Sequence, residues 1–162
     1  YSKEFYELAL SRLKEDGLIV QWLPLHLVGP EDARSITYTF NKVFPEFSVW
    51  NSFLTRIIML IGSRKPVELN KKHFETLMEN MEIQQIANEM KVRSFLDFAD
   101  FYITEGKHLS PFLEGAGEIT DDFPLIEFSS VSLLPPLQWE TDQSFLNLLS
   151  LVFYISELLS IR

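Results

Sequence analysis

The stretch Gly17-Leu18-Ile19-Val20-Gln21-Trp22-Leu23-Pro24 is a short apolar run between a glycine and a proline, with one amide near its far end. Helix-forming patterns lie on both sides of it, which indicates a buried β-strand. Sheets that alternate strands with helices bind ligands beyond the carboxyl ends of their strands. We therefore expect an α/β protein in which this strand delivers Gln21 to the rim of a sheet.

The composition is that of one globular domain with an acidic surface. The 162 residues suffice for a core, and 46% are hydrophobic. The net charge of −9 comes from 23 acidic and 14 basic residues. This charge argues against a nucleic-acid partner and is compatible with a cationic small molecule, although most acidic surfaces serve only solubility.

No catalytic or metal-binding set is visible. The chain has no cysteine, which excludes disulfides and thiolate chemistry, and His26, His73 and His108 match no ligand spacing. There is no glycine-rich nucleotide loop, which a doubly wound sheet normally carries in its first βα turn. We expect the cofactor-binding half to lie upstream, because the chain opens on Tyr1 without a leader and reads as a piece of a longer protein.

A helix is predicted before the central strand and another after it. Ser2 is a suitable cap for the first, whose apolar positions are Phe5, Leu8, Ala9 and Leu13, and Gly17 suits a left-handed end. Pro30 is a suitable first residue for the second helix. The apolar positions of that helix are Ala33, Ile36, Phe40, Val43 and Phe44.

Two further strands are predicted at Phe47–Asn51 and Ile57–Ile61. About five residues join them, too few for a parallel crossover, so they should be antiparallel neighbours. From residue 70 to 114 the pattern favours short helices, the last of which includes Tyr102.

Further along, Leu125–Phe128 alternates like a strand. A terminal helix from Phe145 to Ile161 is apolar on nearly every side. With 17 residues and one glutamate it is short for a membrane span, which needs about 20, so burial or oligomer formation is expected.

Several segments together resemble the second half of spermidine and spermine synthase-like proteins, in the same order and spacing. They are Tyr1–Leu8, Gly17–Leu25, Phe40–Pro45, Leu60–Ser63 and Thr120–Phe128 (TDDFPLIEF). The chain looks most like the bacterial branch in which such a domain is often fused to membrane helices. Residues 1–66 and 118–129 carry the resemblance, the helices between them are only loosely similar, and the tail is unmatched.

The resemblance implies the C-terminal part of a methyltransferase-type Rossmann fold. It would contain three mixed strands, the fifth, seventh and sixth of the family's sheet in that spatial order, flanked by helices. Residues 1–66 would form this sheet, residues 67–129 a helical appendage, and residues 130–162 a proline linker with the apolar helix. The edge of the fifth strand would be open, so self-association or cover by the terminal helix is expected.

The family transfers an aminopropyl group from decarboxylated S-adenosylmethionine to a diamine such as putrescine. The nucleoside site and the acidic residues that deprotonate the amine precede the first helix here, so the resemblance implies no cofactor-binding or catalytic residue in this chain, and the histidine spacing above predicts no metal. Its partners would be the upstream half, a polyamine and a second copy. The location would be cytoplasmic, with the parent protein tethered to the inner membrane if it carries membrane helices.

Four residues match the family's substrate side. Gln21 corresponds to the glutamine that faces the amine, and its carbonyl is an acceptor for an ammonium group. Trp50 and Phe53 lie where the family places an aromatic wall, although the segment between the two strands is shorter here. Asp122 is the better of two carboxylates that would line the cleft. The competing interpretation of Gln21 is an edge amide bonded to loop backbone, and that of Trp50 and Phe53 is core packing. For Asp122 it is a turn cap.

Two other functions remain open. A degenerate synthase-like fold would be a non-catalytic interaction or oligomerisation module. A fragment of an S-adenosylmethionine-dependent methyltransferase is the second alternative. The upstream sequence distinguishes them, since an intact glycine-rich loop and acidic pair favour the enzyme.

Overall fold

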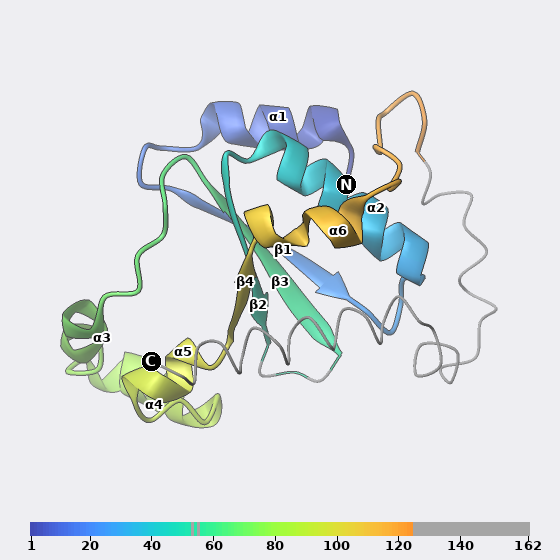
Figure 1. Ribbon diagram of the computed structural model, residues 1–162. Helices are drawn as coiled ribbons and strands as arrows, with labels where there is room; N and C mark the ends of the chain where they lie inside the picture. The colour runs from blue at the N-terminus through green and yellow to red at the C-terminus, as the bar shows by residue number, and fades with distance from the viewer. Residues whose placement is uncertain (53, 55, 125–162) are drawn as a thin grey trace.

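The computed structural model describes residues 1–52, 54 and 56–124, and it shows a mixed α/β protein with a four-stranded antiparallel sheet (Figure 1). The elements in chain order are α1 (Lys3–Arg12), β1 (Leu18–Pro24), α2 (Pro30–Val43), β2 (Glu46–Asn51), β3 (Ile57–Ser63), α3 (Lys71–Leu77), α4 (Met81–Glu89), α5 (Phe95–Ala99), β4 (Tyr102–Glu105), the 3-10 helix η1 (Gly106–Leu109) and α6 (Ser110–Leu113).

The predicted strand from Leu18 to Leu23 is confirmed as β1, but its predicted burial is wrong, because β1 is an edge strand and its Leu18, Val20 and Trp22 side chains are exposed. The strand order across the sheet is β1-β3-β2-β4, and every neighbouring pair is antiparallel. The predicted antiparallel pairing of β2 with β3 is therefore confirmed. The order differs from the expected three-strand arrangement because β4 adds a fourth strand beside β2.

The helix α2 supplies much of the core. Gly29 and Pro30 begin it as predicted, and Ala33, Ile36, Phe40 and Phe44 are buried against the sheet, with Val43 partly buried. The helical spacing of the apolar residues predicted this buried face correctly, because the apolar side of α2 packs on the sheet.

The buried face of α1 is not the predicted one. Ser2 caps the helix as expected, but Phe5 and Leu8 are 53% and 57% exposed, and Tyr6 is the buried residue. Tyr6 packs edge-on against Phe40, with ring centroids 5.1 Å apart. An amphipathic aromatic with a polar tip was not counted among the apolar positions, although its ring packs as well as a phenylalanine.

The end of α1 also differs from the prediction. The helix ends at Arg12, and Gly17 does not have a left-handed backbone, since Gly115 alone among the described glycines has a positive φ, +77°. The last carbonyls of α1 are instead bound by Arg64, whose guanidinium donates to Leu10 O at 2.5 Å and to Leu13 O at 3.1 Å. A cationic side chain at a helix C-terminus satisfies carbonyls that lack helical partners.

The short helices α3, α4 and α5 form where the pattern predicted them, but Tyr102 was assigned wrongly to a helix. It begins β4, because Tyr102-Ile103-Thr104-Glu105 pairs with β2. After β4 the chain packs back onto the core through Leu109, Leu113 and Ile119. Tertiary pairing with β2 outweighs the helical preference of a four-residue segment.

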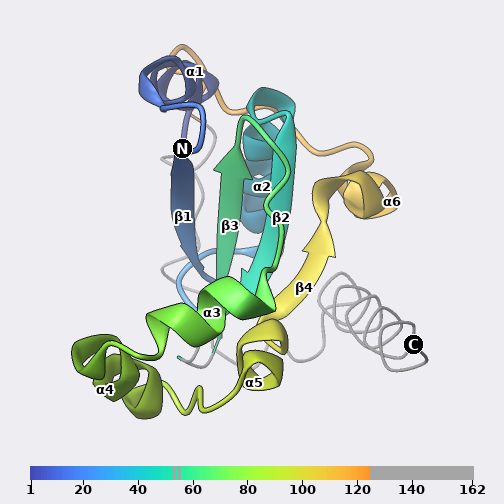
Figure 2. The ribbon, with the colours of Figure 1, turned by 90° about the vertical axis from the view of Figure 1, so that its left-hand side faces the viewer.

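The two faces of the sheet have different environments. Figures 1 and 2 show α1, α2 and α6 on one face, while α3 to α5 lie at one end of the other. We call the face opposite α2 the open face; it carries alternate residues of β1 (Leu18, Val20, Trp22), β3 (Met59, Ile61, Ser63) and β2 (Glu46, Ser48, Trp50).

Several predictions lie outside the described residues, namely the strand at Leu125–Phe128, the terminal helix and the side chain of Phe53. Within residues 1–52, 54 and 56–124, no helix has the length and apolar character needed to cross a membrane.

Candidate functional site

Gln21 lies at the centre of β1 and not at its rim. It pairs with Leu60 in the sheet and its side chain points to the face that α1 covers. The Tyr6 hydroxyl donates to Gln21 Oε1 at 3.4 Å, and Gln21 Nε2 donates to the Trp22 carbonyl at 2.8 Å. The predicted rim position is wrong because β1 runs three residues beyond Gln21, to Pro24.

The partner of Gln21 is a neutral phenol. Tyr6 is fully buried, and desolvation, with a smaller contribution from Tyr1, raises its pKa well above the ordinary value of 10. Burial disfavours the charged phenolate, so the hydroxyl remains a donor at neutral pH. The polar pair is thus a link between α1 and β1.

Trp50 lies on the open face and is 5% exposed. Its ring contacts Phe98 of α5 and Tyr102 of β4, with centroid distances of 5.6 and 5.4 Å. The indole Nε1 donates to Ser48 Oγ at 2.9 Å. Trp50 therefore joins the sheet to the short helices while it forms part of a surface hollow.

Asp122 lies in a turn beside the start of α1. Its side chain is exposed, and the hydrogen bonds that close the turn run from the Phe123 N–H to the Thr120 carbonyl and hydroxyl. The neighbouring Asp121 N–H donates to a Glu4 carboxylate oxygen at 3.0 Å. Thr120, and not either aspartate, is the side chain that caps this turn.

The predicted site residues do not lie together in the structure. Gln21 is on the helix-covered face, Trp50 is on the open face, and Asp122 is beside the N-terminus of α1. Of these three, Trp50 lines a pocket.

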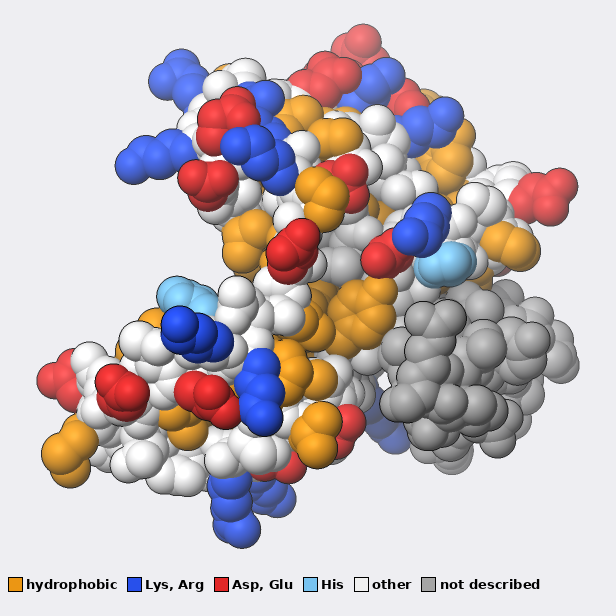
Figure 3. Space-filling model, turned by 60° about the vertical axis from the view of Figure 1, so that its left-hand side comes forward, with side chains coloured by type: hydrophobic (Ala, Val, Ile, Leu, Met, Phe, Trp, Pro, Cys, Tyr) orange, Lys and Arg blue, Asp and Glu red, His pale blue; other side chains and the backbone are white. Residues whose placement is uncertain are grey.

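That pocket lies on the open face between β2, β4 and the segment that leaves β3, and its volume is about 70 Å³. Figure 3 shows the molecule hollowed between the sheet and the α3–α5 helices, with acidic, hydrophobic, histidine and basic side chains around the hollow. We call it the Trp50 pocket. It is lined by Glu46, Phe47, Ser48, Trp50, Ile61, Ser63, Pro66, Val67, Leu69, Tyr102 and Glu105.

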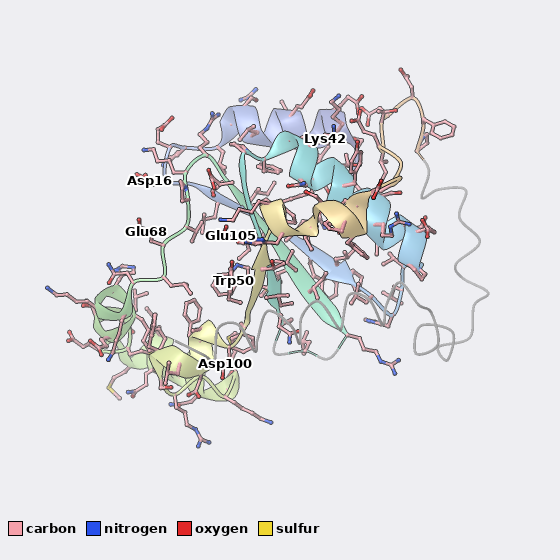
Figure 4. The ribbon with its side chains drawn as sticks, viewed as in Figure 1. Asp16, Lys42, Trp50, Glu68, Asp100 and Glu105 are labelled. Atoms are coloured by element: carbon pink, nitrogen blue, oxygen red, sulfur yellow. The ribbon has the colours of Figure 1, made fainter. Side chains whose placement is uncertain are left out.

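Two carboxylates give the Trp50 pocket a negative character. Glu105 forms an ion pair with Lys107, whereas Glu46 has no ion pair with any residue that the structure describes. Burial, and to a smaller extent the Glu105 charge, raises the pKa of Tyr102 to about 12, so its hydroxyl is neutral beside the carboxylates. Figure 4 shows Trp50 and Glu105 on neighbouring strands, across from the segment that carries Glu68.

Sequence reasoning missed Glu46, Tyr102 and Glu105 because their proximity depends on the pairing of β2 with β4. In that register Ser48 lies opposite Glu105 and Trp50 opposite Tyr102. The available signal was the run Tyr102-Ile103-Thr104, three residue types that favour strands, followed by Gly106.

Comparisons with known proteins do not identify the chain. No family model, no curated protein and no solved structure matches it. In the described segments, no group of three or more histidine, cysteine or acidic residues is arranged to hold a metal ion.

Proposed function

We propose that this chain is the C-terminal part of a spermidine synthase-like aminopropyltransferase and is inactive without an upstream nucleoside-binding half. The observation that carries the proposal is the arrangement of β1, α2, β2 and β3. Strands β1 and β2 run in the same direction, α2 connects them, and β3 lies antiparallel between them. This arrangement agrees with the end of the Rossmann-type sheet that the resemblance implies, to which β4 is an addition.

The unpaired edge of β1 with its exposed side chains, which we call the β1 margin, supports the proposal that part of the fold is missing from this chain. In the part of the chain that the structure describes, β1 pairs with β3 on one side and with no strand on the other. Leu18, Val20 and Trp22 of β1 are 51%, 53% and 49% exposed. An open strand edge with half-exposed apolar side chains is what a sheet presents when a further strand and its cover are absent.

Within this proposal, Gln21 remains the candidate contact for an ammonium group. Its carbonyl oxygen accepts a long hydrogen bond from Tyr6 and has a second lone pair. Because it lies in mid-strand, an amine would have to approach along β1 from the side of the missing neighbour. The upstream half alone would bind the decarboxylated S-adenosylmethionine.

The test begins with the coding sequence upstream of Tyr1. The proposal predicts a strand followed by a glycine-rich loop and then acidic residues that hold the amine. The longer protein should form spermidine from putrescine and decarboxylated S-adenosylmethionine, and the 162-residue chain should form none. Transfer by the 162-residue chain, or none by a longer protein with an intact loop, contradicts the proposal.

The same experiment separates the alternatives. Loss of the glycine-rich loop and acidic pair from the upstream sequence favours a non-catalytic module, with the exposed β1 margin as its binding surface. Methyl transfer from S-adenosylmethionine by the longer protein, without aminopropyl transfer, favours a methyltransferase.

A further inference from the structure

We propose that one side of α4 is a docking surface for a partner protein's helix, in which lysine or arginine residues flank an apolar stripe. None of the residues of α4 is buried. Figures 1 and 2 show α4 at the end of the molecule opposite α1, among the helices beyond the sheet. The surface is therefore separate from any aminopropyl transfer site, and docking there does not need the upstream half.

The apolar residues of α4 repeat with the spacing of a helix–helix seam. Ile83, Ile86 and Met90 follow one another at intervals of three and four residues, as the a and d positions of a heptad do. Ile83 and Ile86 are 36% and 58% exposed, and Met90, the C-cap, is half-buried. A helix of nine residues is marginal in water unless its apolar side packs against something. The stripe is therefore available to a partner and gains stability from one.

Two glutamates on one flank of the stripe select the charge of that partner. Glu82 and Glu89 directly precede Ile83 and Met90, which places them at g positions, where ion pairs between helices determine the choice of partner. Neither carboxylate makes an ion pair or a side-chain hydrogen bond within the part of the chain that the structure describes. A cationic side chain beside the partner's apolar stripe would therefore meet an unpaired carboxylate.

The same charges argue against other occupants of this surface. No lysine or arginine lies in α4, so the pairing of two α4 helices from two copies brings no cation to Glu82 or Glu89. An anionic membrane surface would repel the two carboxylates. A basic amphipathic helix is the occupant that satisfies both the apolar stripe and the acidic flank.

The experiment is an NMR titration of the 162-residue chain with a synthetic helical peptide in which lysines flank a leucine stripe of a and d spacing. We expect saturable shifts at the amides of Ile83, Ile86 and Glu89. A second peptide has glutamate in place of each lysine, and a third has alanine in place of each leucine. Each should bind about tenfold more weakly, because each lacks one of the two matching features. Absence of saturable shifts at α4, or equal binding of either comparison peptide, overturns the proposal.

Variants of α4 locate the site. Glu82→Gln and Glu89→Gln should each weaken binding of the lysine peptide about threefold, and Ile86→Ala about tenfold. Alanine favours a helix more than isoleucine does, so α4 is retained. The matched controls are Glu7→Gln and Leu27→Ala, which remove an exposed charge and an exposed apolar side chain elsewhere. Wild-type binding by all three α4 variants, or equal weakening by the controls, overturns the proposal. The titration needs no nucleoside, so its outcome is independent of the transfer assay.

Discussion

At the scale of single residues, Tyr6 makes the stability of the protein depend on alkaline pH. Its ring is fully buried and its pKa is raised, so the folded protein retains a proton that the unfolded chain loses near pH 10. The stabilisation is complete below pH 10 and falls as the pH rises above it, by up to about 1.4 kcal/mol per pH unit.

The variant Tyr6→Phe should therefore lose less stability between pH 9 and pH 11 than the wild type, measured by urea unfolding. Some loss should persist, because the pKa values of Tyr102, Lys3 and Lys65 are also raised. Equal alkaline loss in the wild type and Tyr6→Phe would refute the assignment.

Gly62 is the second residue with a definite expectation. A Cβ at this position would lie 2.5 Å from Phe44 Cγ and 3.0 Å from Phe40 Cε1. The centroids of those two rings are 4.5 Å apart in the core, so neither ring has room to move away from the new methyl group. Gly62→Ala should reduce the free energy of unfolding by about 1–3 kcal/mol, as overpacking does. In Gly17→Ala the new Cβ would lie 3.0 Å from the nearest Leu13 side-chain atoms and 3.1 Å from the Lys14 backbone nitrogen, which is a less severe overlap, so thermal unfolding should show a smaller loss.

At the scale of elements, α2 holds the segment after α6 by a buried hydrogen bond. The Ile119 N–H donates to Thr39 Oγ1 at 2.9 Å, and the same hydroxyl donates to the Ser35 carbonyl. Thr39→Val keeps the shape but leaves that N–H buried without a partner, which costs about 1–3 kcal/mol.

The control is Thr37→Val, because the Thr37 hydroxyl is buried and donates only to the Ala33 carbonyl, one turn back. Chemical denaturation of both variants measures the difference, and the Ile119 amide should exchange faster in Thr39→Val alone. If the two variants lose the same stability, the contact with Ile119 contributes nothing.

The same elements show what sequence reasoning can reach. The strand Leu18–Pro24 was predictable because a short, mainly apolar run with Ile19 and Val20 follows a glycine and ends on a proline, and the helix Pro30–Val43 because its apolar residues recur at helical spacing. The burial of Tyr6 and the strand at Tyr102 were not, since both depend on distant partners, Phe40 and β2. The Trp50 pocket could not be predicted for the same reason, because Glu46 and Glu105 line one pocket only through the pairing of β2 with β4.

At the scale of the whole molecule, the β1 margin should drive self-association. Its strand edge lacks a neighbour among the described residues, and it displays Leu18, Val20 and Trp22. Two copies pairing their β1 edges would extend the sheet and bury these side chains, whereas a lysine on an edge strand opposes such pairing.

Sedimentation velocity should therefore show oligomers of the wild-type chain that grow with concentration, and Val20→Lys should shift the population towards the monomer. Leu27→Lys is the matched control: Leu27 is 62% exposed but lies in the turn after β1, away from the edge. Both variants replace an exposed aliphatic side chain by lysine and add one positive charge, so the comparison tests the position of that charge. A monomeric wild type at all concentrations, or an equal shift with Leu27→Lys, would show that the edge of β1 does not control association.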